Sequence, residues 1–150
     1  MEQYLSIYRA PKDKLITSSM INNYVKLGVI PKPNKKRYSR IHLAYLIMVC
    51  SLKQVLSISV IQKMLPLDLS EKKIEQAYTS FHLAQKRVFA QTADQVYGSL
   101  NGIFQKENAD FSDYFGFSIE VALTGNVYKI LSEAIADQIQ PGFITESKSS

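Results

Sequence analysis

The sequence has one cysteine and no tryptophan among its 150 residues. Cys50 alone cannot form a disulfide within the chain or supply a cysteine cluster for a metal ion. The amino terminus, MEQYLSIYRAPKDK, has no apolar core of the length that a secretory signal requires. The longest apolar run, near LAYLIMVCSL, falls well short of the ~20 residues of a membrane span. These absences predict a soluble, cytoplasmic protein that has no metal site and no contact with a membrane.

Acidic residues are scarce in the first forty residues. Nine Lys or Arg stand there against Glu2 and Asp13, a net charge of +7, whereas the other 110 residues carry −2. Localised positive charge is typical of a nucleic-acid-binding surface, although an acidic lipid or an acidic protein can also attract it.

The segment SSMINNYVKL, residues 18–27, separates into two faces when it is placed on a helix. Its apolar half contains Met20, Ile21, Tyr24, Val25 and Leu27. Its polar half contains Ser18, Ser19, Asn22, Asn23 and Lys26. An exposed helix face usually carries pairs of Glu and Lys. Short neutral donors and acceptors suit base edges in the major groove better, because Asn pairs with adenine and Ser donates or accepts.

Prolines, glycines and capping residues divide the first half into elements. A short helix is expected over 2–9, followed by the amphipathic helix, which Thr17 or Ser18 caps and Gly28 ends. Residues 29–38 predict a short two-stranded hairpin with Pro33-Asn34 in its turn. The apolar segment RIHLAYLIMVCSLKQVL then predicts a central core helix. A short helix follows between Ser57 and Pro66.

The second half predicts two amphipathic helices. Ser70 caps the first, whose apolar stripe extends from Ile74 to Ile103, and Gly98 and Gly102 are positions where this helix bends or ends. The aromatic segment FSDYFGFS is expected to be a loop, and the last helix covers about 119–138. We therefore expect a DNA-binding domain over 1–66, a helical region over 67–140 and a disordered tail over 141–150.

The segment SSMINNYVKLGVIPKPNKKRYSRIHLAYLIMVCSLKQVLSISVIQKML resembles the DNA-binding domain of MerR-type transcription regulators. In that family a helix with a Tyr near its end leads into Gly, two hydrophobic residues and Pro, and a wing then closes on Arg-Tyr. Tyr24, Gly28, Pro31, Arg37 and Tyr38 stand at those places. The stretch is closer still to an uncharacterised bacterial family of MerR-like helix-turn-helix proteins. The resemblance implies an all-α fold with a small β wing, a MerR-like winged helix-turn-helix followed by a helical region.

Charge and resemblance together predict a sequence-specific DNA-binding transcriptional regulator that is not an enzyme. The polar half of the helix is expected in the major groove of double-stranded DNA. Tyr24 is expected to be a core residue that at most touches a phosphate through its hydroxyl. The side chains expected to hold phosphates from the wing are Lys32, Lys35, Lys36, Arg37, Tyr38 and Arg40.

A homodimer is expected, since one unit reads few base pairs and the apolar stripes over 70–138 need a partner. One alternative is a protein-interaction module that keeps the fold without binding DNA, which the short wing and Asn22 favour. Another is a helical domain in the second half that binds a small-molecule effector. His42 and His82 lack metal-ligand spacing and are expected to be structural or surface residues. Cys50 is expected to be an inert core residue, and no cofactor is expected.

Overall fold

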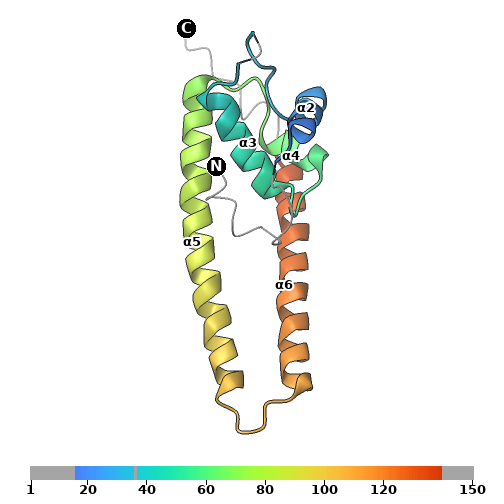
Figure 1. Cartoon of the computed structure of the whole chain (residues 1–150), viewed down its shortest axis with the longest axis vertical. Coiled ribbons are helices and arrows are strands. Elements are labelled where there is room, and N and C mark those ends of the chain that lie inside the picture. Colours follow the sequence, from blue (N-terminus) through green and yellow to red (C-terminus); the bar gives the residue numbers. More distant parts are fainter. Residues whose placement is uncertain (1–15, 36, 140–150) are drawn as a thin grey trace. The chain divides into compact units, whose positions relative to one another are not determined.

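The structure, a computed structural model, describes residues 16–35 and 37–139. These residues form five α-helices and no strand, which confirms the mainly helical fold class. The expected helix over 2–9 and the expected tail over 141–150 lie outside the described residues. The helices are α2 (Ser18–Lys26), α3 (Arg40–Leu52), α4 (Ile58–Met64), α5 (Glu71–Phe104) and α6 (Phe111–Asp137) (Figure 1).

The chain divides into two compact units. The described residues up to Tyr78, together with those over 132–139, form the first, and Thr79–Leu131 form the second. The first unit contains α2, α3 and α4, the start of α5 and the end of α6. The second contains the remaining parts of α5 and α6. Within the described ranges, no helix combines the length and the apolar character that crossing a bilayer requires.

The amphipathic helix α2 begins and ends as its capping residues predict. The Thr17 hydroxyl accepts a hydrogen bond of 3.2 Å from the Met20 amide, which satisfies one of the free donors of the first turn. Gly28 follows the helix with a φ of +64°, a left-handed conformation that favours glycine. Its amide donates to the Val25 carbonyl at 3.1 Å.

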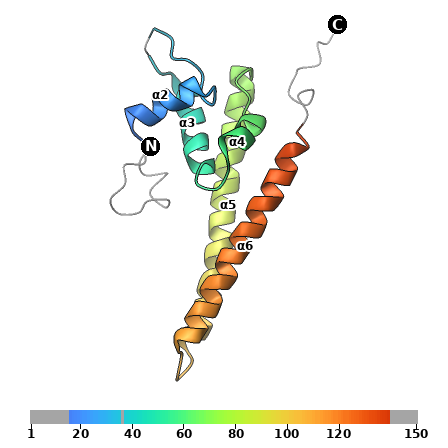
Figure 2. The same ribbon diagram turned by 90° about the vertical axis from the view of Figure 1, so that its right-hand side faces the viewer.

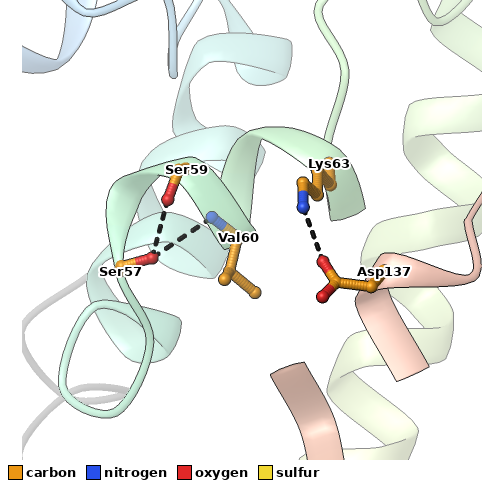
Figure 3. A network of polar contacts seen from close by, with 5 residues as sticks. All are labelled: Ser57, Ser59, Val60, Lys63 and Asp137. Atoms are coloured by element: carbon orange, nitrogen blue, oxygen red, sulfur yellow. Dashed lines mark hydrogen bonds and ion pairs between the residues drawn. The ribbon is translucent and has the colours of Figure 1, made fainter. Parts of the chain in front are cut away.

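The core of the first unit is built around α3, as expected. Eight of the thirteen residues of this helix are buried, from His42 to Ser51. The same core contains Val29 and Ile30, which are completely buried, and Ile61 of α4. Ser57 caps α4 by accepting from the Val60 amide at 3.3 Å (Figure 3). The segment between α2 and α3 is therefore fixed at both ends, by the buried Val29 and Ile30 at its start and by the buried helix α3 at its end.

The two-stranded hairpin expected after α2 is absent from the described residues. One isolated bridge joins Asn34 and Arg37, whose amide donates to the Asn34 carbonyl at 2.8 Å. The next hydrogen-bonded pair of a ladder would be Lys32 and Ser39, but the Lys32 carbonyl and the Ser39 amide both bond to the His42 ring instead. The chain turns at Lys35, which has a φ of +46°, and not at Pro33-Asn34.

The prediction that FSDYFGFS is a loop was wrong, because α6 begins at Phe111. The Asp113 amide donates to the Asp110 carboxylate at 3.2 Å, and the Asp110 amide donates to the Asp113 carboxylate at 3.3 Å. This reciprocal capping satisfies the first turn of the helix. The Lys106 ammonium also lies 2.5 Å from the Asp113 carboxylate. Lys106 therefore holds the pKa of that carboxyl below its usual range, with a further contribution from the Asp110 amide.

The second unit is a helical hairpin made of the later part of α5 and the earlier part of α6 (Figure 2). α5 continues through Gly98 and Gly102 to Phe104, so neither glycine ends the helix. Near the turn, the rings of Phe104 and Tyr114 lie 6.1 Å apart, and those of Phe111 and Phe115 stack at 5.4 Å.

Candidate nucleic-acid interface

The polar half of α2 is exposed to solvent throughout. Ser18, Ser19, Asn22, Asn23 and Lys26 are all exposed, as a groove-facing surface requires. The opposite half turns toward the core of the first unit, where Tyr24 is buried. Burial, and then the nearby Cys50, raise the pKa of the Tyr24 hydroxyl above 10.0. Tyr24 is therefore a core residue and does not belong to the exposed face.

Residues 31–39, which we call the basic loop, follow α2 and lie beside it in both views (Figure 1 and Figure 2). Lys32, Lys35, Arg37 and Tyr38 are exposed there, and so is Arg40, the first residue of α3. Lys36 lies outside the described residues. A hollow is lined by Asn34, Lys35, Arg37, Tyr38, Ser39 and His42. A left-handed backbone conformation is uncommon for lysine. Lys35 adopts it at the turn of the loop, and its cationic side chain is exposed there.

The side chain of His42 links the two ends of the basic loop. Its Nδ1 accepts a hydrogen bond of 3.0 Å from the Ser39 amide and lies 2.8 Å from the Ser39 hydroxyl. Its Nε2 lies 3.1 Å from the Lys32 carbonyl. Because Nδ1 accepts from an amide, the ring proton belongs on Nε2, which then donates to Lys32. The imidazole of His42 therefore holds both ends of the loop, and the Tyr38 ring stands perpendicular to it with the ring centres 5.5 Å apart.

The part of the sequence that contains this surface carries only positively charged side chains over a long stretch. Between Asp13 and Asp68 the sequence contains no acidic residue, whereas it contains nine Lys or Arg. Four described cations of α2 and the basic loop, Lys26, Lys32, Lys35 and Arg37, therefore have no acidic neighbour in the sequence, whereas Arg40 lines a hollow together with Glu71 and Glu75 of α5. A surface of this kind attracts a polyanion from a distance and holds it in a salt-dependent way.

α4 supports the end of α2. The Gln62 side-chain amide donates a hydrogen bond of 2.6 Å to the Leu27 carbonyl, at the point where α2 ends. The next residue, Lys63, lies 2.5 Å from Asp137 at the end of α6 (Figure 3). Sequence reasoning missed Gln62 because its partner lies 35 residues away. It also missed the loop-closing role of His42, for which the N-cap spacing of Ser39 and His42 was an available signal.

Cys50 shows none of the features of a reactive thiol. It is buried inside α3, and burial raises its pKa from 9.0 to about 11. A thiol of that pKa is almost entirely protonated at neutral pH, and the thiolate is the nucleophilic form. Cys50 therefore acts as a small apolar side chain in the core, as the sequence indicates.

Comparison with known proteins places the first half of the chain in a family. No curated protein and no solved structure matches the chain significantly. Residues 1–81, which include α2, the basic loop, α3 and α4, match a family described as a domain of unknown function, DUF1836. The match covers more than half of the 150 residues. The chain belongs to the DUF1836 family.

Proposed function

We propose that this protein is a sequence-specific DNA-binding transcriptional regulator and not an enzyme, and that α2 enters the major groove of double-stranded DNA. The observation that carries the proposal is the composition of the exposed half of α2. It offers two hydroxyls, two amides and one cation, and it stands in a segment of the chain without acidic residues. Such a surface offers hydrogen bonds to base edges without repelling the phosphates.

The dimensions of α2 suit this role. An α-helix with its side chains is about 10–12 Å in diameter, so α2 fits a major groove about 12 Å wide, and its nine residues present about 13.5 Å of length to the bases. Ser18 and Ser19 lie in the first turn, where free backbone amides also favour a phosphate oxygen. Asn22 and Asn23 lie one turn later, and each has the donor and acceptor pair that recognises adenine.

The basic loop supplies the contacts to the backbone. Lys32, Lys35 and Arg37, with Arg40 beside them, are long exposed cations that neutralise phosphates while α2 reads bases. The resemblance to MerR-type DNA-binding domains supports the same assignment, with the basic loop in place of their wing. We include Lys36 and Tyr38 in this backbone contact.

One observation favours a second candidate function, a module that binds an acidic protein. The described residues of the basic loop form no paired strands such as a wing has. Leu27, Tyr38 and Leu43 expose 44%, 47% and 42% of their surface around it. Apolar side chains among cations suit an acidic, partly apolar protein surface. The two functions differ in that only DNA binding selects a base sequence.

Selection from a pool of random duplexes tests the proposed function. The full chain is incubated with the pool at about 0.15 M salt, and the bound duplexes are amplified over several rounds. We expect enrichment of one short motif, because the Asn and Ser side chains discriminate base edges. A folded protein that retains duplexes without enriching any motif does not read sequence, which would overturn the proposal.

A further inference from the structure

We propose that the second unit is a dimerisation module, in which the hairpin of α5 and α6 over 79–131 packs against the same hairpin of a second copy to form a four-helix bundle. The inference uses only the residues of this unit. It does not rest on the proposed binding of DNA.

The first observation is the absence of a core in this unit of a single chain. None of residues 79–131 is buried, and fifteen large hydrophobic residues in that range are exposed. α6 is the clearest case, because apolar side chains occupy most of its circumference. A helix of that kind is normally buried, and most of a helix's stability in a protein comes from packing of its apolar face. The hairpin therefore needs a partner that covers it.

The second observation is a seven-residue repeat of exposed apolar positions on both helices. On α5 the series is Leu83, Ala90, Tyr97 and Phe104. On α6, Leu123 and Ile130 are seven residues apart with Val127 between them, and they expose 61%, 54% and 53% of their surface. Apolar residues at this spacing form the seam of helices that wind around a partner helix.

A shallow groove marks the seam on α6. Its lining includes Gly116, Ile119, Leu123 and Val127, all of which lie on one side of the helix. The glycine leaves open space at its position, since an added Cβ would meet no atom of this chain within 4 Å. The groove thus has the shape and the apolar character that a second helix would fill.

Charge favours a second copy over a polyanion or an acidic membrane. Residues 79–131 contain four Lys or Arg and five Asp or Glu, a net charge of −1. Between Tyr114 and Tyr128 the only charged residue is Glu120. Two copies of a nearly neutral surface approach without repulsion, whereas DNA or acidic lipid gains nothing from it.

The exposed area is sufficient for a stable dimer. Seven aromatic side chains of the unit are exposed, and at roughly 100 Å² each they present on the order of 700 Å². These side chains are spread over both helices, and a standard interface buries about 800 Å² per partner, so the apolar surface that the unit exposes is of the size that such an interface needs. A two-fold axis uses the same patch on both copies and closes the assembly.

The oligomeric state of the full chain tests this inference. Light scattering at micromolar concentration should give twice the chain mass of 17.0 kDa. The midpoint of thermal unfolding should rise with protein concentration, because dimerisation stabilises the folded state by mass action. A monomer whose midpoint does not depend on concentration would overturn the inference, as would an open series of larger assemblies.

Two matched variants of α6 locate the seam. Leu123→Glu places a carboxylate on the proposed interface and should raise the dimer dissociation constant at least tenfold. Ser118→Glu adds the same charge at an exposed position on the opposite half of the helix, five residues before Leu123, and should leave it within about twofold. Leu123→Ala keeps a good helix former at this position and should also raise the dissociation constant. It therefore tests the seam even if Leu123→Glu does not fold. Equal effects at both positions would contradict the seam. A dimer that binds no DNA would support this inference and overturn only the proposed function.

Discussion

The side-chain amide of Gln62 lies 2.6 Å from the backbone carbonyl of Leu27 and donates a hydrogen bond to it. The bond joins α4 to the end of α2 and holds the proposed recognition helix from a second direction. Gln62→Ala should therefore lower the free energy of unfolding by about 1 kcal/mol, the usual value of one hydrogen bond. Urea unfolding measures the change. Gln76→Ala, at an exposed position of α5, is the control and should have a smaller effect.

If the bond also orients α2, Gln62→Ala should weaken binding to the selected DNA more than binding to random DNA. Equal stability of Gln62→Ala and wild type would show that α2 is held without this contact.

His42 is predicted to hold the basic loop closed. His42→Ala removes the partners of the Ser39 amide and the Lys32 carbonyl and should cost about 1–3 kcal/mol of unfolding free energy. The loop should also become more susceptible to limited proteolysis. His42→Asn is the comparison, because its carbonyl can replace Nδ1 as the acceptor from Ser39 but cannot reach Lys32. Its stability should lie between those of His42→Ala and wild type, and identical proteolysis of all three would exclude this role.

Stability should fall in alkaline solution because two core groups resist ionisation. Burial raises the pKa of Cys50 from 9.0 to about 11, and burial with a smaller effect of Asp68 raises that of Tyr45 from 10.0 to about 12. The unfolded chain loses these protons at lower pH than the folded chain does. The stabilisation is therefore complete below pH ~9 and is lost as the pH rises to about 12.

Urea unfolding between pH 8 and pH 11.5 measures that loss. The double variant Tyr45→Phe, Cys50→Ala should show a shallower decline, although it is less stable at pH 8 because Tyr45 also donates to the Pro66 carbonyl at 2.7 Å. A decline as steep as that of wild type would assign the alkaline loss to other groups.

The cations of the basic loop are predicted to contact phosphates. Each of Lys35→Ala, Arg37→Ala and Arg40→Ala should reduce the slope of log binding constant against log salt by about 0.9 per lost contact. Lys86→Ala, in the second unit, removes an equal charge outside the proposed interface and should leave the slope unchanged. A variant lacking all three loop cations with the wild-type slope would remove the basic loop from the interface.

Local signals in the sequence were sufficient for several elements. The Thr17 cap and Gly28 predicted the ends of α2, and the dense apolar run predicted α3 as the core helix, because each depends on neighbouring residues. The start of α6 also has a local signal, the Asp110 and Asp113 pair at capping spacing, but Gly116 and the run of aromatic residues suggested a loop instead. The hairpin was predicted from the segments on either side of a proline-rich turn, and no local pattern indicated that His42 takes the Lys32 carbonyl and the Ser39 amide.

Contacts between distant segments were not predictable. The partner of His42 at Lys32 and the partner of Gln62 at Leu27 depend on how α3 and α4 pack, which no local pattern describes. The polar side chains of α2 were placed correctly on an exposed face because helical periodicity alone determines which residues share a side. The proposed contact of these side chains with base edges depends on the partner, so a binding measurement is what tests it.

Base reading by α2 is tested most directly by Asn22→Ala and Asn23→Ala, two exposed substitutions with a good helix former at the new position. Equilibrium binding of each variant is measured to the selected duplex and to a scrambled duplex of the same composition and length. We predict a loss of about 1–3 kcal/mol on the selected duplex and almost none on the scrambled one, because an amide that pairs with a base affects only sequence-specific affinity. Equal losses on both duplexes, or no loss on either, would contradict the placement of this helix face in the major groove.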